Sequence, residues 1–342
     1  MNLKRIKKLK NSIATPLLVK KKENLLYLTG RSFLNGYLLV KKDKAIFLGD
    51  GLEKAEGVRY VDRLKNIGKY LGSEKKIVLE NVITYAEVEY LKAKVPGLQY
   101  KVVTSPVDKT RSVKTPAEIR DIGRSMKIVE KVFRQVKSTL RKKSWTEKAL
   151  ADFIKNTGMK LGAEDVSFDP IVATGRNAAV PHHVPSDKKL KPGESIILDM
   201  GFKHNNYCSD FTRTVFLKKV PRRLEIAYRQ TELAYSRSLS AVAPGIKTSE
   251  LYNIATRTLA EKNLDKYFVH NLGHGTGLEI HELPNLSPQS REKLEAGNVF
   301  SIEPGVYLPR TGGIRIEDLV YLRGKQVRKF IFVSTKLEDN IL

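Results

Sequence analysis

Two carboxylates in otherwise apolar, strand-like sequence have the type and spacing for chemistry. Asp199 interrupts the apolar run Ile196 to Gly201, and Asp210 lies in a second extended run, Tyr207 to Leu217. If His204-Asn205 forms the tip of a two-residue hairpin, the two acids lie directly opposite each other, with Cβ atoms about 4.5–5.5 Å apart. Like charges in that position destabilise a sheet, and a bound cation would relieve the repulsion. The alternative is a slipped register that leaves one acid in solvent.

A second pair of acids follows the same pattern nearer the C-terminus. Glu303 and Glu317 are equidistant from a turn centred on Arg310, where Pro309 and two glycines supply the chain reversal. Two such pairs in one half of a chain are harder to attribute to chance than one. We therefore expect the four carboxylates to belong to one cation-binding site.

Three of the six histidines lie between these pairs, in the glycine-rich segment Tyr267 to Glu282. Alternating glycines from Gly273 to Gly277 disfavour a helix and allow close backbone approach. We therefore expect His270, His274 and His281 on extended or looped chain. A lone histidine is more often structural, but three in a short glycine-rich segment favour metal binding or acid-base chemistry.

Four carboxylates and a histidine suit two divalent ions per chain better than one. Carboxylate-rich sites favour hard ions, so Mn²⁺ or Co²⁺ is preferred, with Zn²⁺ or Fe²⁺ as alternatives where an imidazole contributes. Two ions about 3.5–4 Å apart can share a water whose pKa falls from 15.7 towards roughly 7, which gives hydroxide at neutral pH. The expected chemistry is hydrolysis.

The order of these residues and the motifs around them resemble the pita-bread metallopeptidases. The residues are Asp199, Asp210, His274, Glu303 and Glu317, within ILDMG, YCSDFTRT, LGHGTGLEIHE, SIEPGVY and GGIRIED. The resemblance is closest to Xaa-Pro dipeptidases (prolidases) and Xaa-Pro aminopeptidases. It covers nearly the whole chain and is most specific from about Ile171 onward.

The resemblance implies a role for each of the five residues. Asp199 would bind one metal ion, and Asp210 and Glu317 would bridge both ions. His274 and Glu303 would complete the coordination of the second ion. Glu303 would also accept a proton from the bridging water and pass it to the leaving proline nitrogen.

The resemblance also implies catalytic residues around the substrate. His182 matches the histidine that steadies the substrate carbonyl or the tetrahedral intermediate. His270, His281 and Arg315 match positions near the substrate, and the last two are associated with peptide ends and the proline-side pocket. His183 falls where relatives often have a small residue, so we favour His182 as the functional histidine and interpret His183 as a wall or surface residue.

Composition limits the class of protein. The 342 residues suffice for two domains with substantial cores. The single cysteine, Cys208, excludes an internal disulfide and fits a reducing compartment, which favours a cytoplasmic location. No apolar run approaches the roughly 20 residues needed to span a bilayer, so we expect a soluble protein without membrane contact.

The formal net charge of +25 is not explained by peptidase chemistry. A strongly basic surface attracts nucleic acid or acidic membranes through nonspecific electrostatics. Lysines crowd at Lys4 to Lys10 and Lys20 to Lys22, but others are spread along the chain without interleaved aromatics or a recognisable nucleic-acid-binding motif. We interpret the charge mainly as a solvated face and retain nonspecific polyanion binding as the alternative.

Residues 1–110 are expected to form a small α/β domain, because helical and strand patterns alternate to about Thr104. The clearest elements are an amphipathic helix over Met1 to Asn11 and strands at Pro16 to Val19, Gly36 to Val40 and Ala45 to Leu48. A polar link follows near Ser105 to Lys114. The domain resembles the non-catalytic N-terminal domain of prolidase and creatinase relatives, which contributes to dimer contacts, so the resemblance implies a homodimer.

Residues 111–342 are expected to form an α+β catalytic domain of the pita-bread, creatinase/aminopeptidase-like type. Thr115-Pro116-Ala117-Glu118 combines a capping box with proline at the first helical position and predicts a helix to about Leu140. The other expected elements are a strand at Phe168 to Thr174 and helices at Thr146 to Gly162, Arg222 to Val242 and Ser249 to Asn263. Two successions of strand, helix, helix and strand agree with a pseudo-symmetric domain.

Three functions fit these observations. The first is a two-metal peptidase that cleaves the bond before proline, in dipeptides or at the N-terminus of longer peptides. The second is another hydrolase on the same scaffold; the long N-terminal domain disfavours methionine aminopeptidase, and the complete metal set disfavours creatine hydrolysis. The third is a basic binding module without peptidase activity, which does not need all five presumed ligands. The short N-terminal domain and compact C-terminus favour the dipeptidase over the aminopeptidase.

Overall fold

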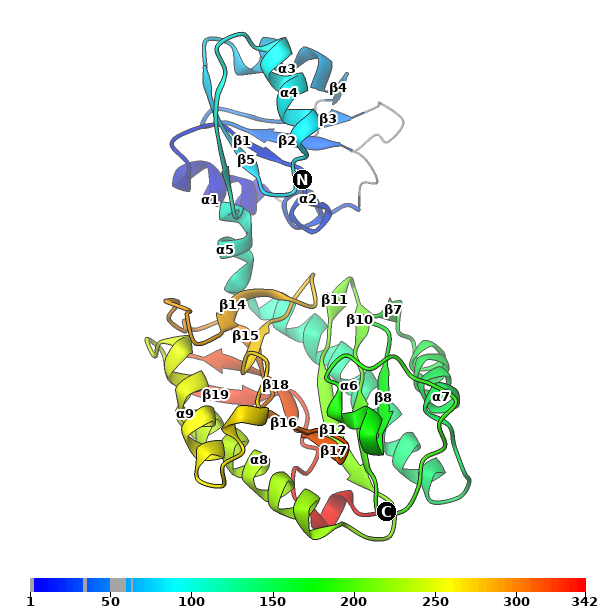
Figure 1. The fold of residues 1–342 in the computed structure, drawn as a ribbon. Coiled ribbons are helices and arrows are strands. Elements are labelled where there is room, and N and C mark those ends of the chain that lie inside the picture. Colours follow the sequence, from blue (N-terminus) through cyan, green and yellow to red (C-terminus); the bar gives the residue numbers. More distant parts are fainter. Residues whose placement is uncertain (1–2, 33–35, 50–59, 63) are drawn as a thin grey trace. The chain divides into compact units, whose positions relative to one another are not determined.

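A computed structural model describes residues 3–32, 36–49, 60–62 and 64–342. The chain divides into two compact units, Met1–Arg111 and Ser112–Leu342 (Figure 1). Each unit has its own sheet and its own buried apolar cluster. The functional residues expected from the sequence all belong to the second unit.

The first unit is a six-stranded sheet in the order β4-β3-β2-β1-β5-β6 with helices around it. Its elements are α1 (Leu3–Ser12), β1 (Leu17–Val19), α2 (Lys22–Thr29), β2 (Tyr37–Val40), β3 (Ala45–Gly49), β4 (Tyr60–Asp62), α3 (Ile67–Leu71), β5 (Lys76–Glu80), α4 (Tyr85–Lys94) and β6 (Gln99–Val103). The expected first helix and the three expected strands are confirmed within the described residues; Met1 and Asn2 lie outside them.

The link expected near Ser105 to Lys114 is largely helical. Pro106–Ser112 forms α5, and the Ser105 hydroxyl accepts a hydrogen bond from the Val107 amide at 3.2 Å. Proline is well suited to the first turn of a helix, where its missing N–H is not needed. The polar composition of this segment therefore marks a short helix and not an extended linker.

The second unit is built on an eight-stranded antiparallel sheet in the order β14-β13-β15-β18-β12-β9-β8, with β19 paired to β18. Its strands are β7 (Asp165–Val166), β8 (Ile171–Thr174), β9 (Ser195–Asp199), β10 (Phe202–His204), β11 (Tyr207–Cys208), β12 (Phe211–Phe216), β13 (Gly273–Gly275), β14 (Glu282–Leu286), β15 (Val299–Ile302), β16 (Gly305–Leu308), β17 (Gly312–Arg315), β18 (Glu317–Arg323) and β19 (Gln326–Lys329). Its helices are α6 (Pro116–Leu140), α7 (Glu147–Lys160), α8 (Arg222–Ser240) and α9 (Thr248–Ala260).

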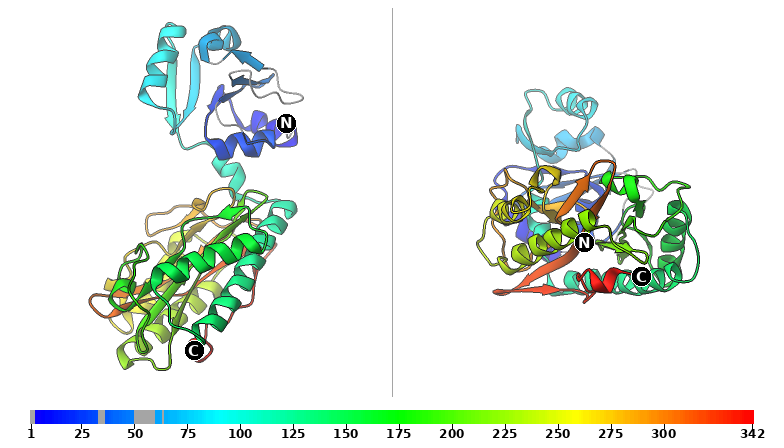
Figure 2. Two further views of the ribbon diagram at one scale, coloured as in Figure 1. Left: turned by 90° about the vertical axis from the view of Figure 1, so that its right-hand side faces the viewer. Right: turned by 60° about the horizontal axis from the view of Figure 1, so that its bottom comes forward.

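These helices form two pairs, α6 with α7 and α8 with α9, which lie over different parts of the sheet (Figures 1 and 2). All four expected helices are confirmed, with ends that differ by a few residues at most. The start of α6 contains the expected capping box, in which the Glu118 carboxylate accepts a 2.7 Å hydrogen bond from the Thr115 amide. Its buried stripe, Ile122, Met126, Val129, Phe133 and Val136, has the spacing of one helix face.

The expected register of the first acid hairpin is wrong. The tip is Asn205-Asn206, not His204-Asn205, and both asparagines have left-handed backbone angles. A two-residue turn of this type needs positive φ at both positions, which asparagine tolerates better than histidine. The shift places Asp199 opposite Thr212, so Asp199 and Asp210 are not a facing pair.

The expected register of the second pair of acids is confirmed. Gly305 pairs with Arg315 in β16 and β17, and Ile302 pairs with Asp318 in β15 and β18. The two pairings share one register, and Glu303 and Glu317 face each other between them. The turn that joins β16 and β17 contains Arg310 with a left-handed backbone, as expected for a tight reversal.

Two helical glycines provide a test of packing in the second unit. A Cβ at Gly158 of α7 would overlap the ring of Phe202, whereas a Cβ at Gly123 of α6 would meet its nearest atom, on Phe330, at 3.5 Å. Gly158→Ala should therefore destabilise the protein by about 1–3 kcal/mol through overpacking. Gly123→Ala should stabilise it by about 0.5–1 kcal/mol, because alanine favours helix. Urea unfolding of the two variants measures both effects, and equal behaviour would contradict the packing described.

Candidate metal centre and active site

A cavity of about 430 Å³ opens in the second unit. Its lining includes all nine residues that the sequence analysis assigned to the site: His182, Asp199, Asp210, His270, His274, His281, Glu303, Arg315 and Glu317. His183 is not part of this lining. Segments separated by more than a hundred residues of sequence therefore meet around one space.

The five expected metal ligands come from five strands that are neighbours in the sheet, β13, β15, β18, β12 and β9. Asp199 ends β9, Asp210 precedes β12, His274 lies within β13, Glu303 follows β15 and Glu317 begins β18. A residue at the end of a strand can turn its side chain towards neighbouring strands without interrupting the ladder of hydrogen bonds. The sheet thus gathers acids that are far apart in sequence at one location.

Three of these residues could hold a metal ion without rearrangement. Ligand atoms of Asp210, His274 and Glu317 all lie within 4.8 Å of one another. His274 Nε2 is also 3.2 Å from the Glu303 carboxylate and 3.4 Å from that of Asp210. The other ring nitrogen, Nδ1, lies 3.1 Å from the Gly275 carbonyl, to which it can donate. Burial lowers the pKa of His274, but hydrogen bonds with Asp210 and Glu303 raise it well above its usual value, so Nε2 would lose a proton when it binds a metal ion while Nδ1 keeps its own.

Two hydroxyl groups fix the glutamates. Thr212 Oγ1 donates to Glu317 at 2.6 Å, and Ser301 Oγ donates to Glu303 at 2.9 Å. The Ser301 hydroxyl also accepts a 3.0 Å hydrogen bond from the His274 amide, which ties two presumed ligands together. A threonine on the neighbouring strand and a serine two residues earlier in the chain thus orient the two carboxylates before any ion binds.

The electrostatics of the cavity favour bound cations. Burial, together with the repulsion of Asp210 and Glu303, raises the pKa of Asp199 to about 7 despite the nearby Arg315. Burial also raises the pKa of Asp210 and that of Glu317, the latter well above its usual value. One oxygen of Asp199, Oδ1, is buried without a hydrogen-bond partner. An orphaned oxygen and acids that resist ionisation fit a donor set meant for divalent metal ions.

Glu303 differs from the other three acids. Burial alone would raise its pKa, but the hydrogen bond and the positive charge of His274 outweigh this effect and lower the pKa to about 2. Burial lowers the pKa of His270 and that of His281, so both imidazoles are neutral near pH 7. Glu303 is therefore ionised beside a charged His274, while His270 and His281 are neutral.

Arg315 makes close polar contacts with the presumed ligand Asp199 and with Tyr307. It contacts Asp199 at 2.6 Å and donates to the Tyr307 hydroxyl at 2.8 Å. That hydroxyl lies 2.9 Å from His270 Nε2, and the Pro181 carbonyl accepts a further contact from Arg315 at 3.3 Å. A continuous chain of polar contacts therefore runs from Asp199 to His270 and also anchors the loop that carries the neighbouring His182.

Tyr307 was missed by the sequence analysis, although a signal was present. The confirmed hairpin register places Gly305 opposite Arg315, and Tyr307 follows two residues later on the same face of β16. Burial raises the pKa of Tyr307 to about 12, so its hydroxyl stays protonated. The same register, continued along β16 and β17, places Tyr307 opposite Gly313 and on the face of Gly305.

The two adjacent histidines, His182 and His183, lie in different environments, as expected. His182 is exposed at the cavity, whereas His183 Nε2 lies 2.8 Å from the buried carboxylate of Glu147. Glu147 also accepts hydrogen bonds from Ser186 and Asn177, so this acid organises the loop that carries both histidines. His183 is thus a structural part of the wall behind His182.

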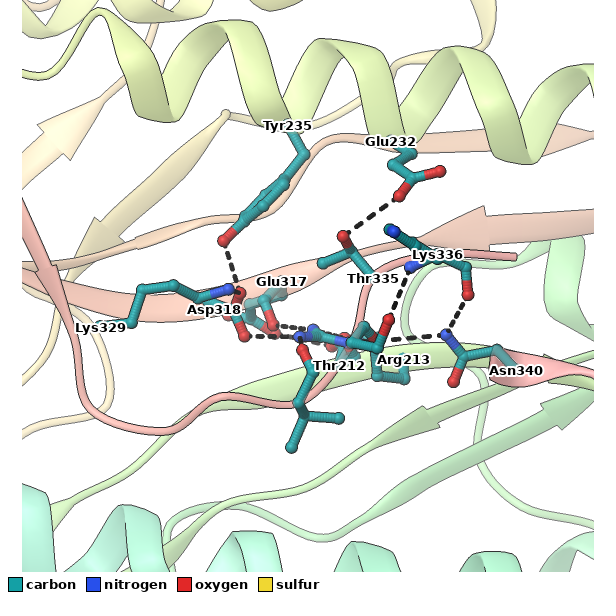
Figure 3. Close-up of polar contacts among 12 residues, drawn as sticks. Thr212, Arg213, Glu232, Tyr235, Glu317, Asp318, Lys329, Thr335, Lys336 and Asn340 are labelled. Atoms are coloured by element: carbon teal, nitrogen blue, oxygen red, sulfur yellow. Dashed lines mark hydrogen bonds and ion pairs between the residues drawn. The ribbon is translucent and has the colours of Figure 1, made fainter. Parts of the chain in front are cut away.

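A second buried network lies immediately behind the ligands (Figure 3). Arg213 is completely buried and donates to the Asp318 carboxylate at 2.7 Å and to the Glu317 carbonyl at 2.6 Å. Asp318 also contacts Tyr235 and Lys329, each at 2.5 Å. Thr212 and Glu317 precede Arg213 and Asp318 in their strands, so the same two strands carry this network, the presumed ligand Glu317 and the threonine that holds it.

Comparison with known families agrees with this geometry. The model of metallopeptidase family M24 matches residues 120–323, and that of the creatinase/prolidase N-terminal domain matches residues 4–113. The chain belongs to metallopeptidase family M24. The expected resemblance and the expected fold class, an α/β N-terminal domain with a pita-bread catalytic domain, are confirmed.

Individual relatives extend over nearly the whole chain. The Xaa-Pro dipeptidase of Pyrococcus furiosus is 33% identical over 95% of this chain and 94% of its own length. A putative Xaa-Pro aminopeptidase of Mycoplasma pneumoniae is 32% identical over 97% and 95%. Among solved structures, the prolidase from Pyrococcus furiosus matches with a TM-score of 0.87 at 30% identity, covering 96% of this chain and 99% of that chain. No helix in the described part of this M24 chain could span a membrane.

The pKa of Asp199 yields a prediction for the metal-free M24 protein. Its folded value of about 7 exceeds the ordinary 3.8, so between these pH values the folded state binds more protons than the unfolded state. This group therefore removes stability as pH rises. Asp199→Asn cannot ionise, and its stability relative to wild type should rise by up to about 1.4 kcal/mol per pH unit between about pH 4 and pH 7.

Urea unfolding of chelator-treated proteins at several pH values measures this difference. Asp152→Asn, on the exposed face of α7, controls for the general loss of one negative charge. A flat difference for Asp199→Asn, or the same slope in the control, would contradict the crowding of acids in the cavity.

Proposed function

We propose that this metallopeptidase is an Xaa-Pro dipeptidase that cleaves the peptide bond before proline. The observation that carries the proposal is the meeting of three buried carboxylates, the half-buried carboxylate of Glu303 and His274 at one cavity, with the Asp199 Oδ1 atom left without a partner. Relatives named Xaa-Pro dipeptidase support the choice of substrate. Residues 111–342 would carry catalysis, and residues 1–110 would be non-catalytic.

The donor set suits two divalent ions, with Mn²⁺ or Co²⁺ preferred. Asp199, Asp210, His274, Glu303 and Glu317 would hold them, with Asp210 and Glu317 shared between both. When bound, the ions would lower the pKa of a water molecule and place positive charge beside the scissile carbonyl. The ions would also satisfy the buried carboxylates that now repel one another.

Glu303 would carry the proton during the reaction. Its carboxylate is ionised and held by Ser301 and His274, so it can accept a proton from the attacking water. The same carboxylate would then give the proton to the proline nitrogen as the bond breaks. The leaving nitrogen is the ring nitrogen of proline, which carries no hydrogen in the peptide bond, and it must gain a proton to depart as a neutral amine and not as an anion.

The histidines and apolar wall would position the peptide. His182 at the cavity mouth would donate to the substrate carbonyl, and neutral His270 and His281 can donate or accept at the peptide ends. Phe168 and Ile171 provide an apolar part of the lining that suits a proline ring. Arg315 would act indirectly, by holding Asp199 and the Pro181 loop.

We further propose a cytoplasmic homodimer. The single cysteine, Cys208, is buried, and burial raises the pKa of its thiol to about 12, which suits a protein that forms no disulfide. The dimer is supported by the creatinase/prolidase N-terminal domain, whose relatives are expected to use it in subunit contacts.

The dipeptidase proposal predicts a substrate preference. Protein reconstituted with Mn²⁺ or Co²⁺ should hydrolyse Leu-Pro and Met-Pro and leave Arg-Pro-Pro largely intact. Product release measured by chromatography for each peptide tests this order. Rapid cleavage of Arg-Pro-Pro with little dipeptide turnover would instead establish the Xaa-Pro aminopeptidase alternative, which the putative aminopeptidase relatives keep open.

The ligand assignment predicts metal content. Asp210→Ala or Glu317→Ala should lose both ions and all activity, because each carboxylate is shared. His183→Ala should keep two ions per chain and alter mainly the preference for the first residue of the substrate, because His183 lies behind His182. Elemental analysis after gel filtration measures the ions. Wild-type stoichiometry in the Asp210→Ala protein would contradict the shared role.

A further inference from the structure

The outward face of α6 carries an unbroken line of cationic side chains. Every exposed position between residues 120 and 134 is arginine or lysine. With the exposed Arg141 one turn beyond Ser138, the line defines the α6 basic face: Arg120, Arg124, Lys127, Lys131, Arg134 and Arg141. Spacings of three or four residues place the first five side chains on one side of the helix. Arg141, seven residues after Arg134, directly follows the end of α6, and the whole row extends over about 30 Å.

Few acids oppose this charge. Half-buried Asp121 lies 3.2 Å from Arg124, and half-buried Glu130 lies 2.8 Å from Arg134. Across the described residues, no ion pair engages Arg120, Lys127, Lys131 or Arg141. Exposed pairs contribute only about 0–1 kcal/mol, so fold stability does not explain six aligned cations. Two of the six cations are paired, and the other four leave the face with a net positive charge.

The C-terminal end of the face is hollowed. A depression of about 450 Å³ is lined by Arg134, Lys137, Ser138, Arg141 and Lys142. All five side chains are hydrogen-bond donors and four are cations, a combination that suits a phosphate group. None of these residues lines the candidate active site. The surface is therefore a separate feature of the molecule.

The types of residue on the α6 basic face favour one class of polyanion over the others. The apolar residues of α6 are buried against the protein, so the helix has no apolar side to insert into a membrane. Its exposed positions include no aromatic side chain on which the bases of a single strand could stack. A straight row of cations instead matches the closely spaced phosphates of a double helix. We propose that the α6 basic face binds duplex nucleic acid through its phosphate backbone, without base recognition.

The test compares two triple variants of the full-length chain. Arg120→Gln, Lys127→Gln and Lys131→Gln together remove three charges from the face. Lys262→Gln, Arg323→Gln and Lys325→Gln remove three exposed charges elsewhere in the same unit. The affinity of wild type and both variants for a 30-base-pair DNA duplex is measured by fluorescence anisotropy from 25 to 200 mM KCl. Circular dichroism and urea unfolding establish that both variants are folded.

The α6 triple variant should show a plot of log affinity against log salt concentration that is shallower by about 2–3 units than that of wild type. The control triple variant should retain the wild-type slope, and duplexes of different sequence should bind equally.

An equal loss of DNA affinity in the two variants would show that the effect comes from net charge alone, and it would overturn the proposal. It would also be overturned by tighter binding of a single strand, or by binding to vesicles containing phosphatidylserine without binding to the duplex. These outcomes do not depend on peptidase activity.

Discussion

The burial of several carboxylates beside one another is the constraint on which this structure depends. Asp199, Asp210 and Glu317 resist ionisation because they lie close together and away from water. A fold built only for stability would not keep such a group, since each buried charge needs a partner. Divalent cations at the proposed metal site would supply that partner. The same cations would explain why five strands converge on one location, so the proposed metal requirement would organise the catalytic unit as well as its chemistry.

Side chains along a strand alternate between the two faces of the sheet, and this two-residue period makes the site rigid. Thr212 pairs with Glu317 across β12 and β18, and the Thr212 hydroxyl holds the Glu317 carboxylate. The next residue on each strand, Arg213 and Asp318, forms a buried ion pair. Such a pair costs desolvation energy that its attraction only partly returns, so its value lies in fixing geometry. Arg213 also holds the Glu317 carbonyl, which links the network directly to a presumed ligand.

The sequence predicted the helices well, and the residues it singled out for the site meet at one cavity, because each had a strong local signal. The capping box at Thr115, the symmetry of Glu303 and Glu317 about a turn, and the glycine-rich histidine segment all reflect short-range rules. The hairpin register of Asp199 was wrong by one residue at the tip, where His204-Asn205 and Asn205-Asn206 both satisfy the polarity of a turn. Backbone conformation decided between them, and polarity does not report it.

Other features of the site had no local signal. Thr212 and Ser301 hold the presumed ligands Glu317 and Glu303, yet as short polar residues in strands they do not differ from ordinary sheet residues. In the sequence, Asp318 is only the residue after Glu317. The structure shows that Asp318 pairs with Arg213 in the buried network. The sequence shows that the chain is rich in lysine and arginine, but it does not show that some of them form the α6 basic face. Only the buried stripe of the helix shows which cations share one side.

The most direct test of the account is the number and position of metal ions in the cavity. Anomalous scattering from crystals soaked in Mn²⁺ should show two peaks about 3.5–4 Å apart, surrounded by the carboxylates of Asp199, Asp210, Glu303 and Glu317. The ring of His274 should contact one of the two. Absence of manganese from this cavity in crystals that bind it elsewhere, or acids turned away from the peaks, would contradict the account.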